Sequence, residues 1–296
     1  SQKFDVVHAT AFPYGWPLIC ALELAHRLNV PFFLTPFVHT GDPEDPHDRM
    51  RRSYTKPALI SLAQAASRVF VQTEVEQETL LDVGVTAEKL TIQGMGVDVE
   101  SCTGGSRKNA RKEWGIENHE IVIGHLANKS WEKGTIDLLR ASQMAWQSGA
   151  DFRLVLAGPE MRNFREFWAT FEPKEKITLR GWLTENQKRD FFAGIDIFAM
   201  PSRSDSFGIV FLEAWMNRLP NLAYRAGGVA SVIRHQVDGL LVRCGDLEGL
   251  ARSIHHLVED APLRERLGQA GYAKTVTDFH WEDKLRLIEE CYHETI

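Results

Sequence analysis

The chain alternates short apolar runs with longer amphipathic stretches from one end to the other. The short runs are rich in Val, Ile, Leu and Phe and have the length and composition of buried parallel strands. The longer stretches repeat apolar residues every three or four positions, which is the period of a helix that lies on a sheet. Because the two kinds of segment alternate, the pattern predicts an α/β protein built from doubly wound parallel sheets.

Two series of strands are predicted, separated by a polar segment. The first series comprises residues 4–9, 31–37, 68–72 and 89–93. Residues 101–109 are polar, contain glycine and lack periodicity, so a linker is predicted over residues 101–118. The second series comprises residues 120–126, 152–157, 176–180, 195–200, 221–224 and 239–242, with helices over 135–147, 185–193 and 247–258. We therefore predict a first domain over 1–100 and a second over 119–277, which face a cleft where strand ends and helix starts converge.

The first domain is predicted to be incomplete. Only four strands precede the linker, whereas a doubly wound domain normally has five or six. The first residue is Ser1 rather than methionine. From these two observations we expect an opening strand, a helix and a phosphate-facing loop to lie outside this chain.

The segment most informative about function is residues 201–214, which places Asp205 and Glu213 eight positions apart. A predicted strand precedes it, and the apolar spacing after Gly208 predicts a helix that begins near that glycine. Free N–H groups at a helix N-terminus favour an anion, and glycine has no side chain to keep a phosphate away. Such a helix start, flanked by two carboxylates that can bind hydroxyls, suits a nucleotide-sugar. An N-cap role for Asp205 and a solvated position for Glu213 account for the same residues equally well.

Composition and charge narrow the classes of function. The formal net charge is -6, and the 34 basic residues are scattered, which argues against a nucleic-acid partner. The four cysteines are far apart, predict neither a zinc site nor a disulfide framework, and are typical of a reducing compartment. No apolar run approaches the ~20 residues that span a bilayer, so we expect a cytoplasmic protein. A basic segment suits peripheral contact with an anionic membrane or a charged acceptor, although a solvated helix face is the simpler interpretation of Arg49, Arg51, Arg52 and Lys56.

Several motifs, taken in order, resemble those of the retaining glycosyltransferases of family 4, which have the GT-B fold and use nucleotide-diphosphate sugars. They are residues 4–9, residues 31–39 with a final histidine, the turn at 94–98, the loop from Gly124 to Gly134, the strand ends at 158–159 and 180–183, the spacing of Asp205 and Glu213, and residues 227–229. The resemblance covers nearly the whole chain. It implies two Rossmann-like domains and transfer of a hexose-type unit from a UDP or GDP sugar to a glycan, lipid or small-molecule hydroxyl. It also implies a C-terminal helix over 278–296 that crosses back to the first domain.

The resemblance assigns a role to each motif residue. Lys133 would stabilise the charge of the leaving diphosphate, and Lys129 or a protonated His125 would supply the second cation. Asp205 would bind the donor sugar and Glu213 the ribose, while His39 would contact the transferred sugar. The remaining donor contacts would be Gly134, Trp182, Leu183, Ser206, Phe207, Gly208 and Ile209. We expect neither a metal nor a cofactor besides the donor.

Departures from the family pattern leave two other hypotheses open. Asp205 is one methylene shorter than the usual glutamate, and His125 stands where arginine is typical. A nucleotide-sugar-binding module with weak or no turnover is therefore the alternative function. A sugar-nucleotide epimerase is a third, with no identifiable acid and base in the first domain. Structural roles are also open, as a capping residue for Lys133, a turn residue for His39 and a core side chain for Trp182.

Overall fold

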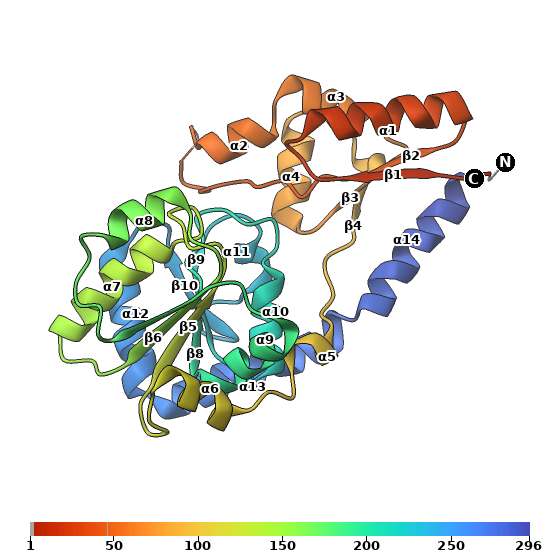
Figure 1. The fold of residues 1–296 in the computed structure, drawn as a ribbon. Coiled ribbons are helices and arrows are strands. Elements are labelled where there is room, and N and C mark those ends of the chain that lie inside the picture. The colour runs from red at the N-terminus through yellow and green to blue at the C-terminus, as the bar shows by residue number, and fades with distance from the viewer. Residues whose placement is uncertain (1–2, 46) are drawn as a thin grey trace.

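The computed structural model describes residues 3–45 and 47–296, which form two α/β domains and a long C-terminal helix (Figure 1). The first domain has a four-stranded parallel sheet in the order β1-β2-β3-β4, and the second a six-stranded parallel sheet in the order β10-β9-β8-β5-β6-β7. The strands are β1 (Val7–Thr10), β2 (Phe32–Thr35), β3 (Arg68–Val71), β4 (Leu90–Ile92), β5 (Val122–Leu126), β6 (Arg153–Ala157), β7 (Ile177–Arg180), β8 (Ile197–Ala199), β9 (Asn221–Arg225) and β10 (Gly239–Arg243).

Helices connect successive strands and cover both faces of the second sheet. The predicted helices at 135–147, 185–193 and 247–258 are found with ends displaced by at most one residue. The helices are α1 (Gly15–Leu28), α2 (Arg49–Tyr54), α3 (Pro57–Ala65), α4 (Glu74–Asp82), α5 (Val99–Cys102), α6 (Arg107–Trp114), α7 (Thr135–Gln147), α8 (Arg162–Trp168), α9 (Glu185–Gly194), α10 (Ile209–Met216), α11 (Val229–Val232), α12 (Leu247–Glu259), α13 (Ala261–Asp278) and α14 (Trp281–Thr295), with a 3-10 turn η1 (Ala87–Lys89).

The polar segment after the first domain is only partly a linker, because about half of it forms a helix. Residues 101–118 contain the helix α6, whose N-terminus is capped by the side chain of Ser106. The buried Ala110 lies on this helix, and the Trp114 ring packs edge-on against Phe191 of α9. The expectation of an irregular stretch was wrong here, because a single apolar face is enough to hold a short capped helix on the second domain.

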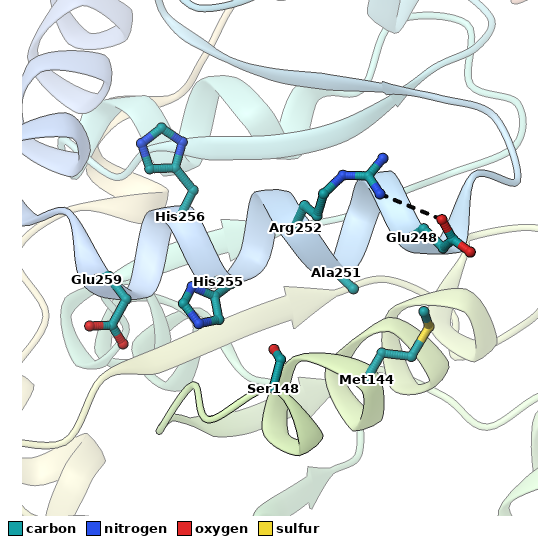
Figure 2. Close-up of a pocket in the computed structure, with 8 residues that line it drawn as sticks. All are labelled: Met144, Ser148, Glu248, Ala251, Arg252, His255, His256 and Glu259. Carbon is teal, nitrogen blue, oxygen red and sulfur yellow. Dashed lines mark ion pairs between the residues drawn. The ribbon is translucent and has the colours of Figure 1, made fainter.

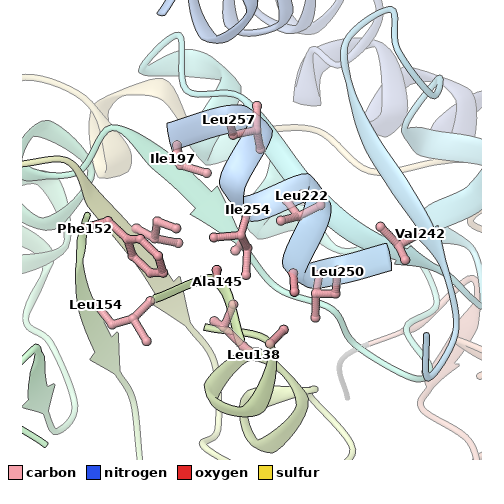
Figure 3. Close-up of a cluster of buried hydrophobic side chains, with 14 of the residues drawn as sticks. Leu138, Ala145, Phe152, Leu154, Ile197, Leu222, Val242, Leu250, Ile254 and Leu257 are labelled. Carbon is pink, nitrogen blue, oxygen red and sulfur yellow. The ribbon is translucent and has the colours of Figure 1, made fainter. Parts of the chain in front are cut away.

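The main core of the second domain lies between its sheet and the helices α7 and α12 (Figure 3). Leu154 and Leu222 point from the strands toward Leu138 on α7 and Ile254 on α12, and all four are fully buried. Burial of each such side chain contributes about 1.5–3 kcal/mol, so the core fixes the strands whose ends carry the site.

The first sheet is covered on its two faces by different parts of the chain. Leu34 and Val69 pack toward the first domain's own helices, whereas the adjacent strand residues Phe33 and Phe70 point to the other face and pack against Cys291 and Tyr292 of α14. His8 on β1 bonds to Thr35 and Tyr292, and burial lowers the pKa of this histidine to about 4. None of the helices in the described ranges combines the length and apolarity of a membrane span.

Candidate active site

The order of strands in the second sheet defines where a ligand is expected. The chain runs outward from β5 to β6 and β7 on one side and from β8 to β9 and β10 on the other. The neighbours β5 and β8 therefore mark the topological switch point, beyond whose carboxyl ends open α/β sheets bind ligands. The loop after β5 carries Lys133 and the loop after β8 carries Asp205.

Lys133 and Asp205 form an ion pair at this switch point. Lys133 Nζ lies 2.6 Å from Asp205 Oδ2, and the side chains are 27% and 14% exposed. Gly134, which follows the lysine, has φ +72° and is the N-cap of α7. A Cβ on this glycine would lie 1.8 Å from the carbonyl oxygen of Pro201, so the two loops approach more closely than any side chain permits.

The helix α10 begins directly beyond this pair. Its N-cap is Gly208, with φ +85° and no side-chain cap, so the interpretation of Asp205 as the N-cap is wrong. Phe207 is buried and packs against Phe279, and the buried Ser206 contacts the loop of residues 226–228 through its backbone. The N–H group of Gly228 donates to the carbonyl of Asp205 at 2.8 Å. The start of α10, with Ile209 as its first residue, therefore offers backbone N–H groups on a rigid support.

His39 reaches the same place from the first domain. Its half-buried ring stacks on Tyr54 with 4.9 Å between the ring centres. Burial lowers the pKa of His39, Lys133 lowers it further, and Asp205 and a bond to the Ser204 backbone oppose this. The structure thus brings His39, Lys133 and Asp205 together, with His39 favoured in its neutral form.

The two domains touch around these residues. The N–H group of Gly41 donates to Ser204 Oγ at 3.1 Å, and the Gly41 carbonyl accepts the N–H of Gly227 at 2.8 Å. A cavity of about 680 Å³ lies beside Lys133. Both domains line it, the first with Tyr14 and Met50 and the second with residues that include Asn128, Ser130, Glu132 and Lys133.

Glu213 lies on α10 but contacts α9 rather than the Lys133–Asp205 pair. Its side chain is 13% exposed and pairs with Lys188 of α9 at 2.7 Å, so the interpretation as a solvated residue is wrong. Lys188 also lies 3.4 Å from Ser101 Oγ on α5. Glu213 is therefore held toward the segment that joins the domains, and it does not contact the Lys133–Asp205 pair.

The two residues considered as a second cation are both committed to the protein. His125 is fully buried; its Nδ1–H donates to the carbonyl of Ala199 and its Nε2 accepts the Thr135 hydroxyl, each at 2.9 Å. Burial lowers the pKa of His125 to about 4, which disfavours the protonated form that a role as the second cation requires. Lys129 is buried, donates to the carbonyl of Arg180 at 2.6 Å and lies 3.7 Å from Glu160.

Trp182 and Leu183 follow the end of β7. Trp182 is 81% exposed, which excludes the interpretation of this residue as a core side chain. Leu183 is partly buried against a hydrophobic cluster of the second domain that includes Val155 and Phe191. A wide exposed ring beside an anchored leucine gives this strand end an apolar surface.

A second hollow lies on the outer face of the second domain, between α7 and α12 (Figure 2). It has a volume of about 560 Å³ and is lined by Met144, Ala251, His255 and His256 among others. These residues lie on helix faces away from the strand ends, so this groove is separate from the site. Within residues 3–45 and 47–296, no three His, Cys, Asp or Glu side chains gather in a way that could hold a metal ion.

Several neighbours of the predicted residues carry no signal of their own in the sequence. Tyr54 stacks on His39 from a helix fifteen positions away, and Lys188 meets Glu213 only because the fold brings residues of α9 and α10 together. Gly41 is the exception, because a glycine in the loop after a strand indicates a close backbone approach.

Comparison with known proteins identifies the family. Residues 106–274, more than half of the chain, match the model described as glycosyl transferases group 1, and residues 1–96 match the glycosyl transferase 4-like domain. The chain belongs to the glycosyl transferases group 1. This confirms the resemblance to family 4, and with it sugar transfer as the class of reaction.

Relatives of this group 1 chain act on different compounds. It is 27% identical to the D-inositol 3-phosphate glycosyltransferase of Pseudarthrobacter chlorophenolicus, over 99% of this chain and 71% of that protein. It is 28% identical to the sulfoquinovosyl transferase SQD2 of Arabidopsis thaliana, over 92% of this chain and 53% of that protein. The relatives therefore extend beyond the matched region.

Solved structures confirm the fold. Anabaena Alr3699/HepE, solved in complex with UDP and glucose, superposes with a TM-score of 0.84 at 21% identity, over 98% of this chain and 78% of that one. Sucrose-phosphate synthase from Thermosynechococcus elongatus gives a TM-score of 0.82 at 19% identity, over 98% and 73%. The two parallel-sheet domains therefore have the GT-B arrangement that the sequence predicts.

Proposed function

We propose that this group 1 chain is a retaining glycosyltransferase that moves a sugar from a nucleotide-diphosphate donor to a hydroxyl of a glycan, lipid or small molecule. The observation that carries the proposal is the meeting of Lys133, Asp205 and His39 beside the uncapped start of α10. Membership of the family supports sugar transfer, and the HepE complexes with UDP and with UDP-glucose support UDP as the first nucleotide to test.

The roles follow from charge. Departure of a nucleoside diphosphate places negative charge on its terminal phosphate, and fixed donors aimed at that charge are the main source of rate enhancement. Lys133 and the N–H groups near Phe207, Gly208 and Ile209 supply such donors. Asp205 holds Lys133 in place before the donor binds, and then accepts hydroxyl groups of the donor sugar.

The other contacts extend from the diphosphate toward the nucleoside. Glu213, fixed by Lys188, accepts the ribose hydroxyls, and Trp182 and Leu183 form a wall for the base. Gly134 and Ser206 border the diphosphate through their backbone, while Lys129 supports the loop that carries Lys133 rather than the phosphate itself.

We infer same-face transfer without a metal. The bond from the anomeric carbon to the phosphate oxygen breaks while the acceptor oxygen bonds to that carbon from the same side, and the acceptor proton passes to the leaving phosphate. His39 is neutral in this mechanism, because its lowered pKa disfavours the cation. The neutral ring donates a hydrogen bond to the transferred sugar or accepts one from it.

A binding module without turnover is the second candidate. It is favoured by the pairing of Lys133 with Asp205 and by the neutral His125, which together leave less positive charge for a leaving group. Such a module would bind UDP or GDP with measurable heat and leave every nucleotide-sugar intact.

The deciding experiment measures release of nucleoside diphosphate from UDP-glucose, UDP-N-acetylglucosamine and GDP-mannose, with and without EDTA. Release that persists in EDTA and is lost in Lys133→Met supports the enzyme, and Lys112→Met, an exposed lysine on α6, is the control. Proton NMR of the anomeric coupling in the product tests retention. Binding without release supports the module instead.

Contact with a membrane is a separate proposal. Arg49, Arg52 and Lys56 are exposed on or beside α2, whereas Arg51 pairs with Asp82. Co-sedimentation with vesicles that contain an anionic lipid tests this face, and recovery of all protein in the supernatant would leave it as a solvated helix surface.

A further inference from the structure

A carboxyl group lies wholly inside the first domain, beneath the loop that carries His39. Glu76, on the first turn of α4, is fully buried. Its Oε1 accepts the N–H group of Val38 and its Oε2 accepts the N–H group of Gln72, each at 2.6 Å. Both oxygens of one side chain are thus used to hold two segments of backbone.

The two amides lie beyond the carboxyl ends of neighbouring strands. Gln72 directly follows β3, and Val38 lies three residues after the end of β2 and directly before His39. Glu76 therefore ties together the two loops by which the first sheet approaches the second domain. Within a few residues of its hydrogen bond to Glu76, each loop contacts the second domain.

Both loops contact the backbone of the residues around Asp205. Three residues after Val38, Gly41 bonds to Ser204 Oγ and to the N–H of Gly227. One residue after Gln72, the Thr73 methyl group lies 3.0 Å from the position that a Cβ would occupy on Gly228. Gly228 in turn donates to the carbonyl of Asp205. Through its two amides, Glu76 therefore sets how His39 and the first-domain loops meet the loop that carries Asp205.

A carboxyl group at this position is costly to bury, because no cation compensates it. An apolar side chain of similar shape would avoid that cost, but it would leave the buried N–H groups of Val38 and Gln72 without acceptors. Burial raises the pKa of Glu76 to about 8, although the two amides act in the opposite direction. The residue is explained instead by its geometry, since two acceptors on one rigid carboxyl can hold two loops at once.

We propose that Glu76 is a positioning residue for sugar transfer, which fixes His39 and the Gly41 loop against the donor loop of the second domain. This inference rests on the proposed function for its effect on rate. It predicts control of the rate of the chemical step and not of nucleotide affinity, because the contacts proposed for the nucleotide lie on the second domain. Misplacement of a reacting group by about 1 Å costs about 100-fold in rate.

The test uses Glu76→Gln, which keeps the shape but replaces one acceptor oxygen with an amide donor and so releases one loop. We expect a 10- to 100-fold fall in the rate of UDP release from UDP-glucose, with the calorimetric Kd for UDP unchanged. The NMR resonance of the His39 ring is expected to shift, while the rings of His8 and His125 keep their wild-type signals. Glu78→Gln is the matched control, because Glu78 is exposed two positions along the same helix.

A second variant and a hydrogen-exchange measurement test the role of Glu76 further. Glu76→Asp retains the carboxyl group but is one methylene shorter, so it is expected to show the same split between rate and affinity. In the wild-type protein, the amides of Val38 and Gln72 are expected to exchange slowly with deuterium. Wild-type release by Glu76→Gln with an unmoved His39 resonance would overturn the proposal, as would rapid exchange of both amides. If the wild type releases no UDP, GDP or sugar from any donor, the proposed function fails, and the His39 resonance and amide exchange still decide the positioning claim.

Discussion

Replacement of Lys133 by methionine is the sharpest test of the site, because it removes one charge and keeps the length of the side chain. UDP at 100 times its Kd stabilises a folded protein by about 2.7 kcal/mol. A hydrogen bond to a charged group contributes about 1.5–3 kcal/mol, and the upper part of that range applies where the lysine is mostly buried. Its loss raises Kd about 100-fold.

The same UDP concentration then equals the Kd of the variant and stabilises it by only about 0.4 kcal/mol. Since 1 kcal/mol moves the Tm of a chain of this size by about 2–4 °C, the shift caused by UDP falls from about 5–10 °C to about 1–2 °C. Differential scanning fluorimetry measures both shifts, each against the same variant without ligand, and Lys112→Met is expected to behave as the wild type. A folded Lys133→Met with the full wild-type shift would refute the placement of a diphosphate at this lysine.

Three further outcomes are expected from the same geometry. Asp205→Asn keeps the UDP-induced shift but lowers UDP release from UDP-glucose by about 100-fold, because its carboxylate is assigned to the sugar; equal losses of binding and rate would contradict that assignment. Glu213→Gln weakens UDP about tenfold in calorimetry but leaves 2′,3′-dideoxy-UDP unaffected, and an equal loss for both ligands would remove the ribose contact. Because Glu76 holds its proton more tightly when folded, with a pKa of about 8, its contribution to stability falls as pH rises from about 5 to 8. Urea unfolding is expected to show the wild type losing about 1.4 kcal/mol per pH unit relative to Glu76→Gln over this range, and parallel pH profiles would contradict the buried ionisation.

The sheets were predictable because buried parallel strands are continuous apolar runs, and every predicted strand is present with its ends displaced by at most three residues. The helix start at Gly208 was predictable because apolar spacing changes to a helical period there. Lys133 and Asp205 could be placed at one edge by topology alone, since both follow parallel strands.

The rest depended on packing between segments that are distant in sequence. Thr73 and Glu76 have the spacing of an exposed capping box, and only the loop from β2 that covers Glu76 turns it into an internal tether. His125 has the position of a cleft residue at the end of β5, but its ring points into bonds with Ala199 and Thr135. The local sequence does not determine the orientation of either side chain, because a residue near a strand or helix end can point toward solvent or toward the core.

The helix α14 has a consequence for how the chain is made. It covers one face of the first sheet, where Phe33 and Phe70 pack against Cys291 and Tyr292. On the ribosome, that face stays bare until α14 has been synthesised, so the first domain completes its core only after the second domain has been made. A chain that stopped before α14 would leave Phe33 and Phe70 uncovered on that face.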